Sequence, residues 1–186
     1  MKIKMVLAVL ILGVLTGCAG MMFETGVKRE GQISNLPVID SKIIYYKPVL
    51  YKSGFQRWSF VGNKPEPEPS QALIEFKNAF LANTASIFKE NGYEFVEIQN
   101  NPSENPPIYI EVRLAFRRGI PVLVASTGGT RWFVHFNGEY VFEIYEWQLV
   151  SVVGIGGEKS AGQDLSKKSV EDFLKQIKKI STAQSP

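Results

Sequence analysis

Residues 108–117 read Ile-Tyr-Ile-Glu-Val-Arg-Leu-Ala-Phe-Arg, the clearest strand pattern in the chain. Apolar side chains stand at every second position, as in a strand, whose side chains point alternately to the two faces of a sheet. The apolar set is Ile108, Ile110, Val112, Leu114 and Phe116, and the alternate set is Tyr109, Glu111, Arg113, Ala115 and Arg117. A sheet with one face against helices and the other in water produces this pattern.

Two amphipathic helices are available to cover the apolar face. The first is predicted over residues 70–91, with Ser70 as N-cap and Asn91-Gly92 as C-cap. The second is predicted from a cap at Asp164 or Ser166 to about residue 180. Their apolar positions recur at helical spacing: Leu73, Phe76, Phe80, Thr84, Ile87 and Phe88 in the first, and Val170, Phe173, Leu174, Ile177 and Ile180 in the second.

Several further strands are predicted. Residues 42–51 are rich in β-branched and aromatic side chains, and Pro48 restricts part of this strand to an edge or a bulge. Residues 93–98 alternate as a strand, and residues 122–125 predict a shorter one. The glycine-containing segments 126–129 and 151–163 are interpreted as a flexible stretch and a loop.

Asn137-Gly138 gives the clearest hairpin signal, because this pair is preferred in two-residue type I′ turns. The resulting register pairs Phe136 with Glu139, His135 with Tyr140, Phe133 with Phe142, and Trp132 with Glu143. It also places Arg131 and Glu146 on one face, close enough for an ion pair.

These elements predict an α+β fold, in which a mostly antiparallel sheet of about five or six strands carries two helices on one face. A single domain is expected over residues 41–180, preceded by a tether over 18–40 and followed by a disordered tail over 181–186.

Leu15-Thr16-Gly17-Cys18 follows an apolar run over residues 5–15, which itself follows Lys2 and Lys4. The run would rise only about 16 Å as a helix, against a bilayer core of about 30 Å, so it fits a signal peptide better than a membrane span. The four residues resemble the lipobox of bacterial lipoproteins.

The lipobox resemblance implies cleavage of residues 1–17 between Gly17 and Cys18, and attachment of acyl chains such as palmitate to Cys18. Two or three chains hold a protein stably on a membrane. Because Ala19 stands where enteric-type bacteria place an inner-membrane retention aspartate, the resemblance implies the periplasmic face of the outer membrane. The inner membrane and the cell surface remain alternatives.

Charge and cysteine content restrict the remaining possibilities. The net charge of +3 falls to +1 without Lys2 and Lys4, which gives no electrostatic case for a nucleic-acid partner. Cys18 is the only cysteine, so the domain has no disulfide and no cysteine-based metal site. We expect no metal and no cofactor.

The candidate catalytic motifs are weak. Residues 154–160 end in Glu-Lys-Ser rather than the Gly-Lys-Ser of a phosphate-binding loop, and the carboxylate at Glu158 would repel a nucleotide. His135 is the only histidine, and neither Ser126 nor Ser151 sits in a nucleophile elbow beside it. We therefore expect no catalytic residues, and interpret His135 as a cross-strand partner of Tyr140.

Two surface sets are candidates for function. Arg113, Arg117, Arg118 and Arg131 could line one sheet face and meet anionic headgroups, glycan or an acidic partner. Glu139 and Glu143 are predicted on one face about 13 Å apart, too far for a glycosidase pair, whereas Glu111 and Glu143 could come closer.

The layout is similar to a broad group of periplasmic lipoproteins of unknown function. The likeness rests on the 91–93 turn, the 107–112 strand, and the 145–147 strand followed by a glycine loop and helix. Related folds occur in the N-terminal domain of the Tol-system propeller protein and in lipoproteins that activate peptidoglycan synthases. The lipobox, the long tether and the absence of a credible catalytic cluster favour a lipid-anchored, non-enzymatic interaction module with an envelope protein partner. The alternatives are an accessory subunit of an envelope transport or secretion complex, expected to form stable oligomers, and a glycan hydrolase using paired glutamates.

Overall fold

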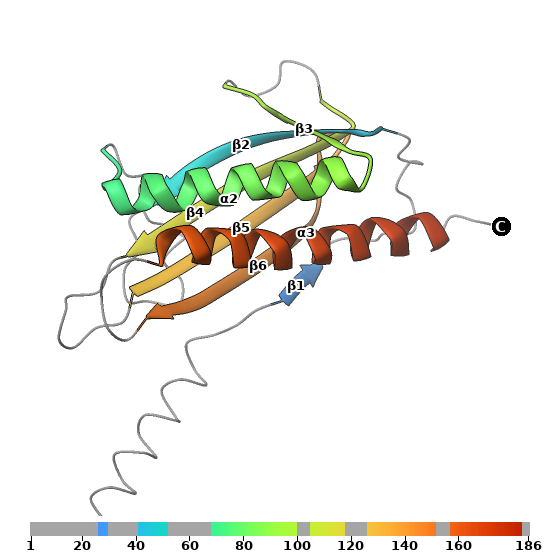
Figure 1. Ribbon diagram of the computed structural model, residues 1–186. Helices are drawn as coiled ribbons and strands as arrows, with labels where there is room; N and C mark the ends of the chain where they lie inside the picture. The colour runs from blue at the N-terminus through green and yellow to red at the C-terminus, as the bar shows by residue number, and fades with distance from the viewer. Residues whose placement is uncertain are drawn as a thin grey trace, which may run out of the picture.

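The computed structural model describes residues 26–29, 41–51, 68–99, 105–117, 126–151 and 157–183. A six-stranded sheet has the order β1-β6-β5-β4-β2-β3, and helices α2 and α3 lie across one of its faces (Figure 1). The predicted α+β class, with two helices on one face, is confirmed. The strands are β1 (Gly26–Arg29), β2 (Ile43–Tyr51), β3 (Glu94–Glu97), β4 (Ile108–Arg117), β5 (Ser126–Phe136) and β6 (Glu139–Ser151), and the helices are α2 (Gln71–Glu90) and α3 (Glu158–Ala183).

The sheet is mixed. β1, β6, β5 and β4 pair antiparallel, whereas β2 pairs parallel with both β4 and β3. The parallel part arises because α2 carries the chain from β2 back to β3, as parallel strands require a crossover connection. β3 pairs only with residues 43–46 of β2, so Pro48 lies beyond that ladder, where its missing N–H is tolerated.

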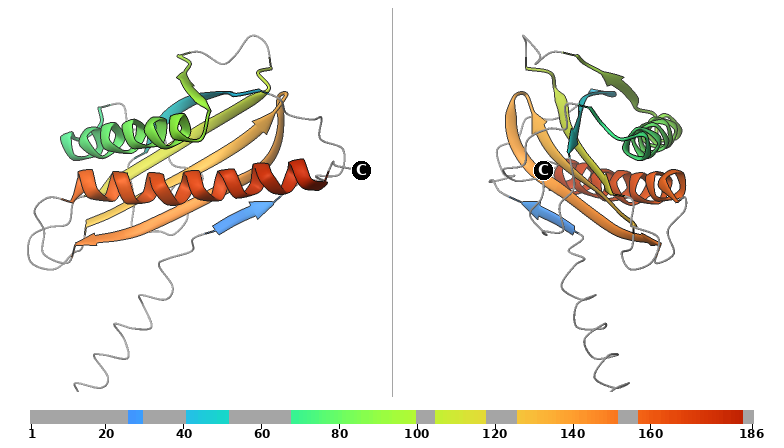
Figure 2. Two further views of the ribbon diagram at one scale, coloured as in Figure 1. Left: turned by 45° about the vertical axis from the view of Figure 1, so that its right-hand side comes forward. Right: turned by 90° about the vertical axis from the view of Figure 1, so that its left-hand side faces the viewer.

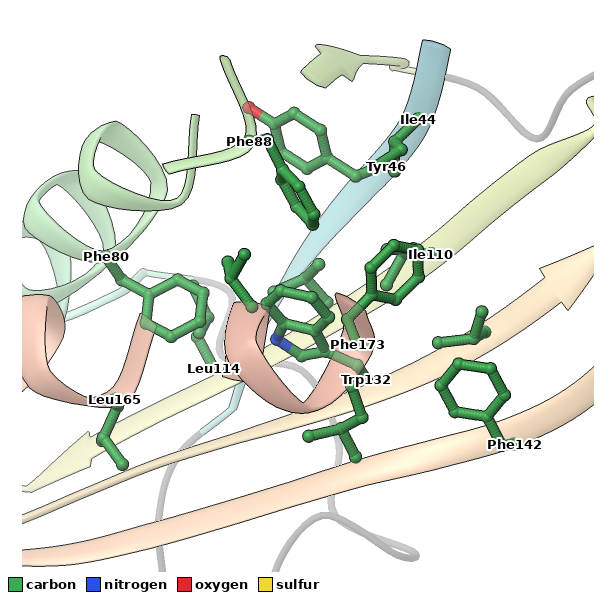
Figure 3. Packing of buried hydrophobic residues seen from close by; sticks show 14 of the residues in the cluster. Ile44, Tyr46, Phe80, Phe88, Ile110, Leu114, Trp132, Phe142, Leu165 and Phe173 are labelled. Carbon is green, nitrogen blue, oxygen red and sulfur yellow. The ribbon is translucent and has the colours of Figure 1, made fainter. Parts of the chain in front are cut away.

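β4 shows the alternation predicted for residues 108–117. Its five apolar residues are buried against the helices, together with Trp132 of β5 and Phe142 of β6. Phe88 of α2 and Phe173 of α3 meet the ring of Trp132 at centroid distances of 6.2 Å each (Figure 3). Aromatic side chains therefore form the centre of the core, between the two helices and the middle strands.

α2 matches its prediction. The hydroxyl of Ser70 accepts a hydrogen bond from the N–H of Leu73 at 3.3 Å, which caps the N-terminus. At the other end Gly92 has φ +79°, a conformation that glycine adopts without strain.

The N-terminus of α3 corrects a prediction. The helix begins at Glu158, before the caps expected at Asp164 or Ser166, so much of the segment interpreted as a glycine loop is helical. A Cβ at Gly162 would lie 2.7 Å from the main-chain oxygen of Phe76 in α2. Gly162 is therefore a close-packing position between two helices. The helix also reaches Ala183, into the segment expected as a tail.

The segment expected as a tether contains a strand. β1 adds to the edge of the sheet beside β6, with Gly26 opposite Tyr145 and Arg29 opposite Phe142. The strand expected over residues 122–125 lies outside the described residues.

The hairpin prediction is correct at the turn and wrong beyond it. Phe136 pairs with Glu139 and His135 with Tyr140, but a register shift between Val134 and His135 places Phe133 opposite Glu143. The same shift pairs Val134 with Phe142 and Trp132 with Ile144, contrary to the predicted register. An extra residue on one strand of a hairpin moves every following side chain by one position.

Candidate functional site

Four rows of side chains cross β2, β4, β5 and β6 on the sheet face opposite the helices, which we call the outer face. The first row is Tyr45, Tyr109, His135 and Tyr140; the second is Lys47, Glu111, Phe133 and Glu143; the third is Val49, Arg113, Arg131 and Tyr145; the fourth is Tyr51, Ala115, Gly129 and Trp147. The strands carry these residues on the face that the second set of the β4 alternation predicts.

The first row is aromatic. The ring of His135 lies 5.6 Å from that of Tyr109 and 5.7 Å from that of Tyr140. Burial lowers the pKa of His135, and burial followed by the charge of Glu111 raises the pKa of Tyr109. Both shifts favour the neutral forms, so the rings of this row pack as an uncharged aromatic surface. The predicted cross-strand pairing of His135 with Tyr140 is confirmed.

The second and third rows form a network of charges around one ring. The guanidinium of Arg131 donates to one carboxylate oxygen of Glu143 at 2.6 and 3.0 Å, and Arg113 forms an ion pair with Glu111. Both guanidiniums also lie over the ring of Phe133, at 4.3 Å for Arg113 and 4.9 Å for Arg131. Each arginine is thus fixed by a carboxylate and by a cation–π contact.

The fourth row corrects the interpretation of residues 126–129 as flexible. These residues form the first part of β5. A Cβ at Gly129 would lie 2.0 Å from Cε3 of Trp147, so the glycine is required for the indole to lie across the strand. Ala115 is fully buried in a small cluster with Tyr51, packed by Val49, Tyr145 and Trp147.

The predicted arginine set is partly brought together. Arg113 and Arg131 are direct cross-strand neighbours, and the glutamates offset their mutual repulsion. Arg117 ends β4 but its side chain is not among those described, and Arg118 lies outside the described residues. Arg131 binds Glu143 rather than the predicted Glu146, because the register shift moves Glu146 to the helix face.

The glutamates do not form the predicted pairs. Glu139 lies opposite Phe136, on the helix side, so it does not share a face with Glu143. Glu111 and Glu143 do share the outer face, with Phe133 between them, and each carboxylate is bound by an arginine. Among the described residues, no group of three or more His, Cys, Asp and Glu side chains is placed to bind a metal ion.

A second feature, missed at the sequence level, lies between β6 and α3. The side chain of Glu146 is only 3% exposed, and its Oε2 has no hydrogen-bond partner within the described part of the chain. Burial, followed by the neighbouring carboxylate of Asp172, raises the pKa of Glu146 to about 7. Lys168 and Lys175 oppose that rise. The carboxyl therefore titrates near neutral pH under the helix.

Residues 17 and 18, which carry the expected cleavage and lipidation, lie outside the described residues. None of the described helices is long and apolar enough to cross a membrane.

The fold has solved counterparts. No family model and no curated protein matches this chain. The chain is similar to a PelC dodecamer from Paraburkholderia phytofirmans, at 12% sequence identity and a TM-score of 0.51, over 79% of this chain and 97% of that one. A single-substitution variant of the same protein aligns at 11% identity and a TM-score of 0.47, over 81% and 97%. The first similarity shows a shared fold, and the second carries no further argument.

Proposed function

We propose that this chain is a lipid-anchored envelope protein on the periplasmic face of the outer membrane that acts by binding, as one subunit of a homo-oligomeric assembly. The contact surface between copies is the first three rows of the outer face, most of whose side chains are half-buried. The observation that carries this proposal is the arrangement of aromatic and arginine side chains in rows on one sheet face.

The composition of the outer face fits a protein–protein interface. Tyrosine, tryptophan, phenylalanine and arginine are enriched in interfaces and supply most of the strongly contributing residues. Here the arginines are already held by Glu111, Glu143 and the ring of Phe133. Side chains that are fixed before binding lose less conformational entropy when a partner docks.

The fold-level similarity supports an oligomer. The similar chain was solved as a dodecamer, and it shares almost its whole length with this one. Homo-oligomers usually have closed symmetry, so one surface repeated in each copy is sufficient to build the assembly. The lipobox at residues 15–18 supplies the anchor, and an accessory role in envelope transport or secretion accords with an anchored oligomer.

Photo-crosslinking in living cells tests this proposal. A photoreactive amino acid is placed at Tyr109 on the outer face, and at the exposed Asn78 of α2 as the matched control. We expect Tyr109 to give an adduct between two copies of this chain, and Asn78 to give none. An adduct from Asn78 alone would exclude the outer face as the interface. An adduct of Tyr109 with a different protein would replace the homo-oligomer with a heterologous complex.

A further inference from the structure

β1 shortens the connection between the expected lipid and the domain. Its first residue, Gly26, lies eight residues after Cys18, and eight extended residues span at most about 29 Å. If the chain were unpaired from Cys18 up to Ser41, the same calculation would allow a distance of about 80 Å between the lipid and the domain. The pairing of β1 with β6 therefore holds the β1 edge of the sheet close to any membrane in which Cys18 is anchored.

One flank of α3 faces that same edge. In both figures α2 and β1 lie on opposite sides of α3 (Figure 1 and Figure 2). On the α2 side, Gly162 meets the backbone of Phe76, and Ser166 accepts a hydrogen bond from Asn83 at 2.6 Å. On the other side, Lys168 and Lys175 act on the carboxyl of Glu146 in β6.

The flank towards β1 is basic. Lys168 and Lys175 are exposed, and Lys179, also exposed, lies one turn beyond Lys175 on the same side of the helix. Asp172 is the carboxylate among them and binds Lys175 at 3.2 Å. Over residues 163–179 the helix carries five lysines against Asp164, Glu171 and Asp172, which leaves an excess of positive charge.

We propose that the α3 flank formed by Lys168, Lys175 and Lys179, with β1 beside it, faces the membrane and binds anionic phospholipid headgroups. This inference rests on the lipid anchor proposed above. The anchor brings the flank within reach, and clusters of lysines are attracted to anionic membrane surfaces within about a Debye length. The opposite edge of the sheet, at β3, then points away from the membrane.

Energy transfer to a headgroup-labelled lipid measures this orientation. The lipidated protein is placed in vesicles that contain anionic phospholipid, and a fluorophore is attached through Glu171→Cys on α3 or through Glu94→Cys on β3. Both positions are exposed, and both substitutions remove one glutamate. Lipidation consumes the thiol of Cys18, the only native cysteine, so the added thiol is the sole site of labelling. We expect stronger transfer from position 171 than from position 94.

Two sets of variants test whether the pairing of β1 and the lysines of α3 produce this orientation. Val27→Pro with Lys28→Pro removes the N–H groups of two successive β1 residues. One of the two N–H groups points towards β6, so the double change breaks the β1–β6 pairing and should reduce energy transfer at position 171. Changing Lys168, Lys175 and Lys179 to Gln should also reduce it, with up to about a fivefold loss of the docked population per lysine. The matched triple change at Lys77, Lys89 and Lys159 should leave it unchanged.

The mass of the purified protein separates the two possible failures. If Cys18 carries no acyl chain, both the anchor and this orientation are wrong. If Cys18 is acylated but positions 171 and 94 transfer equally, the anchor stands and the membrane-facing flank is refuted. Equal loss in the two lysine triples would refute the specific role of the α3 flank.

Discussion

Replacing Glu146 with glutamine should stabilise the protein at pH 8 and change its stability little at pH 4.5. The carboxyl is buried between β6 and α3, and its pKa rises from the usual 4.5 to about 7. The folded state therefore binds the proton more tightly than the unfolded state. Between pH 4.5 and 7 the unfolded chain loses this proton first, so the stability of the wild type falls as the pH rises, and the full penalty applies above pH 7.

The magnitude follows from the size of the pKa rise. At 1.36 kcal/mol per pKa unit, the rise corresponds to about 3 kcal/mol. Residual solvent screens part of it, which gives an expected gain of about 2 kcal/mol for Glu146→Gln at pH 8. A neutral amide of similar shape fills the same space without a charge to bury.

Urea unfolding between pH 4.5 and 8.5 measures this gain. The free energy of unfolding of the variant minus that of the wild type isolates Glu146, because the contributions of groups such as His135 cancel. Glu139→Gln, at the exposed end of the hairpin, is the matched control, and its free energy of unfolding should stay within about 0.5 kcal/mol of the wild type. A difference that stays constant with pH, or a variant less stable than the wild type at pH 8, would show that burial of the Glu146 carboxylate does not destabilise the protein.

Two further predictions concern the outer face and use urea unfolding at pH 7. Gly129→Ala should destabilise the protein by about 2 kcal/mol, because its Cβ would overlap the indole of Trp147. An unchanged urea midpoint would show that the indole moves aside without loss of stability. Arg131→Ala should cost about 3 kcal/mol, since it leaves the buried carboxylate of Glu143 unpaired. Arg113→Ala should lower the free energy of unfolding by no more than about 1 kcal/mol, because its partner Glu111 is more exposed than Glu143. Equal losses for the two arginines would show that this difference in burial has no effect on stability.

Much of the fold follows from local patterns in the sequence. The period-two alternation of β4 defines both sheet faces, and the cap residues at Ser70 and Gly92 define the ends of α2. The start of α3 could not be predicted in this way, because Gly162 looks like a loop residue in the sequence. Its role as a helix contact depends on the position of Phe76, far away along the chain.

The candidate site was predictable in composition but not in pairing. The alternation places Arg113 and Arg131 on one face, as the structure confirms. Their partners depend on strand register, and one shift between Val134 and His135 exchanges Glu146 for Glu143 beside Arg131. The sequence does contain a signal of that shift. Val141 and Phe142 are adjacent and both are buried, whereas adjacent residues of a regular strand point to opposite faces.

Native mass spectrometry of the protein extracted from membranes in mild detergent tests the proposed function, because one spectrum reports both the anchor and the assembly. We expect a complex of several identical chains, each beginning at Cys18 and carrying the added mass of acyl groups. A monomeric chain without acyl groups would contradict the proposed function.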